Sequence, residues 1–421
     1  MLDQLLFQAS PAQMAISSAL SATQASFSAL KSAIQKPATV PPTAEPVVKV
    51  SAPPALNALA SQSAASSKYL YANLESEEKA RIAVINAAIQ SPEKFLSAYK
   101  LHRVIGFGSN GVVASAQDFQ GRAVAVKVIY KERVSHAPTA VPPEVEVLSH
   151  LSEEGHSDNL LQFVEHWQDS HHHYLVTELF GADWSQAAPA NPSDTLRPLV
   201  FKTSYKARIT IHNLPFSAGS SDLWSWAWAH RAHVQRTEGH SLLPLQPVKD
   251  VVRQVAQGLQ FLHQRGFYHG DVKVENILVQ DTAHEGGVKL ADFGHANHAS
   301  MGIRQYGTAE LSAPEFLADS PFRHHVTVDG RAADVFALGM VLYMLLSEQG
   351  TLPSSVYALM GSQATGWEHL LHVEGGEYPL DSLADVDSRD AVWSLLRGMV
   401  RVDPGQRLTV EQVLSHPWFS D

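Results

Sequence analysis

The short segment 269–276, with the sequence HGDVKVEN, limits what this chain can be more than any other part of it. It places a carboxylate (Asp271), an ammonium group (Lys273) and a side-chain amide (Asn276) in one loop. Asp271 can accept a hydrogen bond from an incoming hydroxyl group and aim it at phosphorus, and Lys273 can neutralise the phosphoryl group. Asn276 offers a carbonyl oxygen, the kind of ligand that Mg²⁺ prefers. A charged surface turn is the alternative, but the segment predicts phosphotransfer.

A second carboxylate lies in the segment 289–294, with the sequence KLADFG. Asp292 could bridge a metal ion to the β- and γ-phosphates of a nucleotide. Metal, lysines and backbone donors would then together offset the charge that spreads over the transferring group. We therefore predict Asn276 and Asp292 as the ligands of Mg²⁺.

Three glycines lie close together in the segment 106–113, with the sequence GFGSNGVV. Glycines let a backbone approach phosphate oxygens where any Cβ would clash. A dinucleotide-binding loop would run straight into a helix, whereas residues 112–117 and 123–129 have the pattern of two strands around a turn at Gly121. We predict a strand-turn-strand flap over a triphosphate. Its candidate nucleotide-binding residues are Gly106, Phe107, Gly108, Ser109, Asn110, Gly111, Val113, Ala125 and Lys127.

Lys127 stands near the end of the second of these strands, where its ammonium group could hold the α- and β-phosphates. Glu144 begins an apolar helical pattern further along and could pair with Lys127. Glu146 is the competing carboxylate. The apolar residues Val147 and Leu148 favour Glu144 as the side chain that turns inward.

Taken together and in order, these motifs resemble the eukaryotic protein kinase family over residues 99–419. Further matching segments are 313–315 (APE), 334–339 (DVFALG) and 414–419 (LSHPWF). In this family, Glu315 is expected to pair with Arg407. Independent matches in one order make chance agreement not credible.

The resemblance implies an α+β protein with the two-lobed protein kinase fold. A small, antiparallel, β-rich N-lobe would carry one main helix, and the larger C-lobe would be helical. ATP and Mg²⁺ would be the cofactors, and proteins would be the substrates. The catalytic residues would be Asp271, Lys273, Lys127 and Glu144.

The serine/threonine branch of the family is favoured by Lys273 and by Thr308, whose hydroxyl group would contact the catalytic aspartate and lysine. Thr308 would then be architectural, with a role as a phosphosite left open. By resemblance, the Glu178 carbonyl and the Phe180 amide would bind adenine at the hinge between the lobes. Asp222 would hold the ATP ribose, and Asp183 is the alternative.

Gly270 is the clear departure from the family, because most relatives carry arginine beside the catalytic aspartate. That arginine usually binds a phosphorylated activation loop, so we expect activity that does not depend on such phosphorylation. The hydroxyl residues between residues 292 and 315 are Ser300, Tyr306, Thr308 and Ser312. Glu275 stands where some members bind arginine, which predicts basic residues near the target hydroxyl group.

Two rival functions remain from the sequence. A pseudokinase that acts as an ATP-binding signalling scaffold is disfavoured because the catalytic and metal-binding residues are all present. A small-molecule kinase is disfavoured by Glu315, Asp334 and Arg407, which belong to a platform for protein substrates.

The chain has four parts by composition and pattern. Residues 1–66 are rich in Ala, Ser, Pro and Gln and predict a disordered tail, or a docking segment through apolar residues at helical spacing. Residues 67–98 predict a helical lead-in, residues 99–180 the N-lobe and residues 181–421 the C-lobe. An insertion at about 185–221 would carry a hairpin.

Composition excludes several other classes of protein. The chain has no cysteine, which rules out disulfides and cysteine-ligated metals, and it has no apolar run of the length that a membrane span needs. Its net charge of -11 argues against broad nucleic-acid binding. We expect a cytoplasmic or nuclear protein without a leader peptide. The histidine run 171–173 predicts a solvated turn rather than a metal site.

Overall fold

The computed structural model of the chain describes residues 80, 83–84, 86–88, 90–91, 93–108, 110–131, 141–182, 201–202, 210–211, 221–303, 306–316, 328–356, 378–380 and 390–420. The predicted tail 1–66, together with Ser109 and Asp183, lies outside these residues. Within them, no helix combines the length and apolar character that crossing a bilayer requires.

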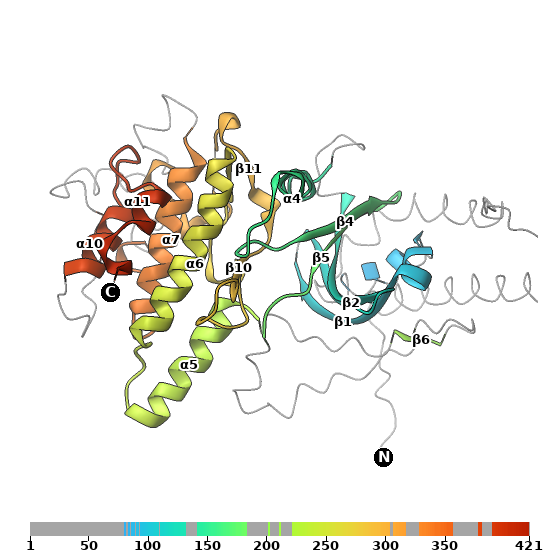
Figure 1. The fold of residues 1–421 in the computed structure, drawn as a ribbon, viewed down its shortest axis with the longest axis horizontal. Coiled ribbons are helices and arrows are strands. Elements are labelled where there is room, and N and C mark those ends of the chain that lie inside the picture. The colour runs from blue at the N-terminus through green and yellow to red at the C-terminus, as the bar shows by residue number, and fades with distance from the viewer. Residues whose placement is uncertain are drawn as a thin grey trace, which may run out of the picture. The chain divides into compact units, whose positions relative to one another are not determined.

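The chain divides into two compact units. The first contains residues 1–138, 167–174 and 196–216, and the second contains residues 139–166, 175–195 and 217–421. Antiparallel strands dominate the first unit, whereas the second is mainly helical (Figure 1). The contrast between a strand-rich and a helical unit agrees with the predicted α+β fold, but residues 139–166 and 175–180, which the sequence placed in the N-lobe, fall in the second unit.

A five-stranded sheet has the order β1-β2-β3-β5-β4. Its strands are β1 (Tyr99–Phe107), β2 (Gly111–Asp118), β3 (Ala123–Tyr130), β4 (Phe163–Gln168) and β5 (His172–Glu178). The β-branched residues of β3 suit a buried strand, and most of them are buried. Gly121 turns the chain between β2 and β3 with φ of +84°, which confirms the predicted strand-turn-strand pattern.

An aromatic stack stabilises the first unit around Trp167. The Tyr99 and Tyr174 rings stack on it with centroid distances of 5.7 and 4.8 Å. Lys94, in the π-helix η1 (Lys94–Ala98), places its ammonium group 4.8 Å from the same ring. Aromatic and cation–π contacts of this kind add to the stability that apolar burial provides.

The expectation of a solvated turn at residues 171–173 was wrong for two of the three histidines. His172 and His173 lie in β5 and are each only 1% exposed. The turn itself is made by Asp169, whose carboxylate accepts hydrogen bonds from the backbone amides of His171 and His172. Burial opposes ionisation of Asp169, but these hydrogen bonds and those of His172 and Tyr174 side chains lower its pKa to about 2. The sequence run did not show that the strand begins inside it.

The second unit is built on helices of different lengths. They are α4 (Pro143–Glu154), α5 (Leu223–Glu238), α6 (Leu245–Gln264), α7 (Gly330–Leu346), α10 (Asp390–Met399) and α11 (Val410–Leu414). Helix α7 is apolar on nearly all sides and is almost completely buried, as such a helix must be. Helices α6 and α10 pack against it, and α11 packs against α6 (Figure 1).

Short elements carry the predicted chemistry between α6 and α7. They are β8 (Phe267–Tyr268), η4 (Val274–Asn276), β9 (Ile277–Val279), β10 (Val288–Leu290), η5 (Phe293–His295), β11 (Asn297–His298), η6 (Ala299–Met301), η7 (Ala309–Leu311) and η8 (Pro314–Phe316). Strands β9 and β10 form one two-stranded sheet, and β8 and β11 form another. The 3-10 helix η11 (Pro417–Phe419) closes the described chain.

Two sequence predictions fall only partly on described residues. Those described within residues 76–90 of the lead-in are helical, and Ala80, Ala83 and Ala87 among them are buried. In the predicted insertion, the short strands β6 (Phe201–Lys202) and β7 (Thr210–Ile211) pair antiparallel, as predicted for a hairpin.

Candidate active site

Asp271 is the centre of a tight polar cluster in the second unit. Its carboxylate accepts a hydrogen bond of 2.6 Å from the Thr308 hydroxyl group and lies 2.8 Å from Lys273 Nζ. The Asn276 amide nitrogen donates to the same carboxylate at 3.0 Å and to the Asp271 backbone carbonyl at 2.9 Å. Lys273 Nζ also donates to Thr308 Oγ1 at 3.1 Å. Lys273 and Asn276 of the same loop and Thr308 from a later segment therefore hold one carboxylate in one orientation.

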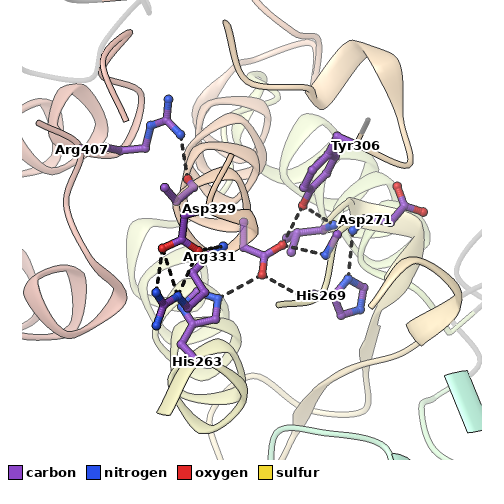
Figure 2. Close-up of polar contacts among 11 residues, drawn as sticks. His263, His269, Asp271, Tyr306, Asp329, Arg331 and Arg407 are labelled. Carbon is purple, nitrogen blue, oxygen red and sulfur yellow. Dashed lines mark hydrogen bonds and ion pairs between the residues drawn. The ribbon is translucent and has the colours of Figure 1, made fainter. Parts of the chain in front are cut away.

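The buried carboxylate of Asp334 on α7 binds the backbone of the predicted catalytic loop. Asp334 is 0% exposed and accepts hydrogen bonds from the backbone amides of His269 (2.7 Å) and Gly270 (2.8 Å). Tyr306 Oη donates to it at 3.2 Å, and His263 Nε2 lies 3.0 Å away (Figure 2). A buried carboxylate is stable only with such partners, so α7 sets the backbone position of the loop.

The His269 ring links the loop to the segment that carries Asp292. His269 Nε2 lies 3.0 Å from the Ala291 carbonyl, and Nδ1 lies 3.3 Å from the Asp271 amide. The ring is also 5.1 Å from that of Phe293. Burial lowers the pKa of His269. A neutral ring, with one nitrogen donating and the other accepting, fits both contacts.

Asp292 itself is exposed and is the one described non-glycine residue with a positive φ, at 59°. A left-handed aspartate is uncommon, and such backbone strain gathers at functional sites. Helix α4 contacts η5, the 3-10 helix that starts directly after Asp292. Glu144 on α4 is buried whereas Glu146 is exposed, which favours Glu144 as the inward carboxylate.

Two glycines allow the close approach of backbone to the cluster. Gly270 has φ of +77°, and a Cβ there would lie 2.5 Å from the His295 carbonyl oxygen. A Cβ at Gly307 would lie 2.7 Å from the Asp271 carboxylate. The residue that departs from the family is thus one where this backbone leaves no room for a side chain.

All four predicted hydroxyl sites have hydrogen-bond partners. Ser300 Oγ lies 2.6 Å from His298 Nδ1, and Ser312 Oγ donates to the Thr308 carbonyl at 3.1 Å. Thr308 binds Asp271, as the resemblance implied. Tyr306 is 1% exposed, donates to Asp334 and accepts from the Val272 amide, so its hydroxyl group is not accessible. Burial, with the nearby Asp334 charge, raises the pKa of Tyr306 well above its ordinary value.

The predicted pair of Glu315 and Arg407 is confirmed. The guanidinium group binds both carboxylate oxygens, at 2.7 and 2.8 Å, and both side chains are completely buried. Arg407 also donates to the carbonyls of Ala332 and Arg401. This pair connects η8 to the N-terminal turn of α7 and to the end of the chain.

The predicted hinge begins at the end of β5. Thr177 Oγ1 donates to the Glu178 carbonyl at 3.1 Å, and the Glu178 amide donates to the Gln162 carbonyl at 3.0 Å. Asp222, the ribose candidate, is the N-cap of α5 and accepts from the Ser225 amide at 2.7 Å. Burial, together with the charge of Glu275, raises the pKa of Asp222. Asp222 therefore already has a structural task beside the one predicted for it.

The three glycines of the glycine-rich segment 106–113 differ in how much space surrounds them. A Cβ at Gly111 would lie 2.3 Å from the Val128 carbonyl, so the sheet itself requires glycine there. At Gly108 no atom lies within 4 Å of such a Cβ, and Gly106 has only ordinary contact. The antiparallel register sets Val113 opposite Lys127. The pairing of Lys127 with Glu144 stays a prediction.

The sequence reasoning did not predict several contacts that shape the site. It placed Asp334 in a platform for protein substrates and Tyr306 among the hydroxyl sites, and it gave His263 no role, but both Tyr306 and His263 bind the Asp334 carboxylate. Lys289 lies within the motif 289–294, but nothing in that motif indicated a contact with another segment. Contacts over so long a sequence separation leave no local pattern to find.

Comparison with known proteins identifies the class. The protein kinase domain family matches residues 99–197 and 228–419, more than half of the chain. The calcium/calmodulin-dependent protein kinase type 1 of Macrobrachium nipponense is 24% identical over 76% of this chain, and CBL-interacting protein kinase 20 of Oryza sativa subsp. japonica is 27% identical over 78%. The probable serine/threonine-protein kinase KCC4 of Saccharomyces cerevisiae is 25% identical over 77%.

The matched regions cover 75%, 59% and 26% of these three relatives, respectively. The fold is that of a protein kinase. The chain belongs to the protein kinase family, in its serine/threonine branch.

Proposed function

We propose that this chain transfers the γ-phosphate of ATP to serine and threonine hydroxyl groups of proteins. The observation that carries the proposal is the Asp271 carboxylate, which Thr308, Lys273 and Asn276 hold by hydrogen bonds and charge. A carboxylate held in this way can accept the proton of an incoming hydroxyl group and orient that group for in-line attack.

The residues present fit ATP and Mg²⁺. The open space at Gly108 suits the approach of phosphate oxygens to the backbone of residues 106–111. Asn276 directs its amide nitrogen toward Asp271, so its carbonyl oxygen and the exposed Asp292 carboxylate are the oxygen ligands that would hold Mg²⁺. When bound, the metal ion would neutralise charge on the transferring phosphoryl group.

The test is phosphate transfer from labelled MgATP to a degenerate peptide array, with Asp292→Ala as the matched variant. We expect the wild-type signal to disappear in the variant. Nucleotide binding without transfer by the wild type would favour the pseudokinase, and equal signals from the two proteins would contradict the assignment of Asp292.

Activity should not require a phosphorylated activation loop. Gly270 offers no cation, and the tight contact with the His295 carbonyl excludes a side chain at this position. Treatment of pure enzyme with phosphatase is expected to leave kcat unchanged. Loss of activity after this treatment, restored by incubation with ATP, would show that a phosphorylated residue is needed.

We propose that the substrates carry basic residues near the target hydroxyl group. Glu275 is exposed on η4, and its charge acts on the nearby buried Asp222. The exposed Glu275 carboxylate would suit a guanidinium group of the substrate. On the peptide array, Glu275→Gln should weaken the selection for arginine relative to wild type, and an unchanged array pattern would remove Glu275 from this role.

A further inference from the structure

A buried lysine contacts two side chains of the predicted adenine-binding hinge. Lys289 lies on β10 and is only 7% exposed. Its ammonium nitrogen is 2.6 Å from Glu178 Oε1 and 5.0 Å from the centroid of the Phe180 ring. These two hinge residues are the ones whose backbone groups are predicted to bind adenine.

Glu178 is held through both its backbone and its side chain. The oxygen that binds Lys289 also accepts from the Gln162 amide at 3.0 Å, and the Glu178 amide returns a hydrogen bond to the Gln162 carbonyl. Strand β5 ends at Glu178, and residues 179–182 form no strand. Within this stretch, the Ala182 amide donates to the Val279 carbonyl.

The Lys289 ammonium group therefore restricts how the hinge can turn. Side chains two residues apart in an extended chain face the same side, and both Glu178 and Phe180 face this ammonium group. A buried cation that loses its partner is strongly destabilising. Rotation of the backbone between residues 178 and 180 would take away the carboxylate, the aromatic ring or both from Lys289.

We propose that Lys289 is a positioning residue for the adenine site: through Glu178 and Phe180 it keeps the hinge carbonyl and amide in the orientation that binds the base. The inference rests on the proposed function, because it concerns the ATP site of the same enzyme. Lys289 touches neither the reacting atoms nor Asp271 in this role. Its loss should weaken nucleotide binding and leave the chemical step intact.

The experiment compares Lys289→Met with Lys249→Met in the full-length chain. Lys249 is a matched control because it is equally buried, at 8%, but lies on α6 near Trp418. We expect Lys289→Met to raise the Kd for MgADP, measured by calorimetry, and the KM for ATP by about tenfold each. The kcat should stay within about twofold, and Lys249→Met should change neither constant.

Two further variants separate positioning from packing. Lys289→Arg keeps the charge and should restore most of the affinity, whereas Glu178→Gln removes the charge of the partner and should weaken binding as Lys289→Met does. The double variant should be no weaker than the single ones, because the two changes remove one interaction.

An equal Kd for MgADP in Lys289→Met and Lys249→Met would overturn the proposal, as would additive effects in the double variant. If Lys289→Met does not fold, Glu178→Gln decides in its place. Calorimetry needs no turnover. If the wild type transfers no phosphate, the proposed transfer activity is contradicted. A tenfold loss of MgADP affinity in Lys289→Met relative to that wild type would still support the role of Lys289.

Discussion

The catalytic loop of the second unit and the glycine-rich segment of the first unit contribute to one predicted reaction but differ in how they are held. At the loop, Asp271 and Asp334 have several donors each, and Gly270 and Gly307 leave no room for a Cβ. At the glycine-rich segment, only Gly111 is required by its own sheet, and Gly108 faces open space. The predicted catalytic loop is thus held by hydrogen bonds within the second unit, whereas the segment predicted to cover the phosphates has open space beside Gly108.

The largest effect should come from breaking the buried pair of Arg407 and Glu315 in the second unit. Arg407→Met leaves Glu315 charged and buried without its partner, which should lower the free energy of unfolding by about 3–5 kcal/mol. Urea denaturation measures this change. Arg253→Met is the control, because the Arg253–Asp250 pair is partly exposed and should contribute no more than about 1 kcal/mol. A similar loss in both variants would contradict the importance of the buried pair.

A matched pair of glycine substitutions tests the comparison directly. The new Cβ in Gly307→Ala would push against the Asp271 carboxylate, and such a displacement should reduce kcat about a hundredfold. The new Cβ in Gly108→Ala has no protein atom within 4 Å, so thermal stability should be unchanged and the KM for ATP should rise. Steady-state kinetics and thermal unfolding of both variants provide the measurements. The comparison would fail if Gly108→Ala were the less stable of the two.

Thr308 allows a smaller test of the same cluster. Thr308→Val removes the hydroxyl group that bridges Asp271 and Lys273 while keeping the shape of the side chain, and kcat should fall about tenfold. Thr308→Ser keeps the hydroxyl group and should retain most of the activity. Phosphate on Thr308 in fully active enzyme, seen by mass spectrometry, would instead support the regulatory alternative.

The smallest effect concerns pH. His269 has a pKa lowered by burial, so it stays neutral in the folded chain while the unfolded chain takes up a proton near pH 6.5. The unfolded state then binds more protons below about pH 6.5, and the free energy of unfolding must decrease as the pH falls through this range. Unfolding of wild type and His269→Phe at pH 7.5 and 5.5 should show a smaller loss in the variant. His171, His230 and His416, whose pKa values are also lowered by burial, contribute equally to both proteins.

Much of the fold could be predicted because its signals are local. Strands β1 to β3, helix α4 and the turn at Gly121 follow from apolar patterns and glycine positions within a few residues of each other. The histidine run shows the limit of this reasoning. Three adjacent histidines suggested a polar turn. The boundary of β5 depends instead on pairing with another strand, and His172 and His173 are buried within β5.

By itself, the sequence determined which chemical groups are present and in what order: Asp271, Lys273, Asn276 and Asp292 were predicted as site residues from their residue types and spacing. Only the tertiary structure decided what holds them. Asp334 on α7 binds the backbone of the loop 269–276, and Lys289 on β10 binds Glu178 at the end of β5. The physical reason is burial, because a charged group inside the protein needs partners, and packing brings those partners from distant segments.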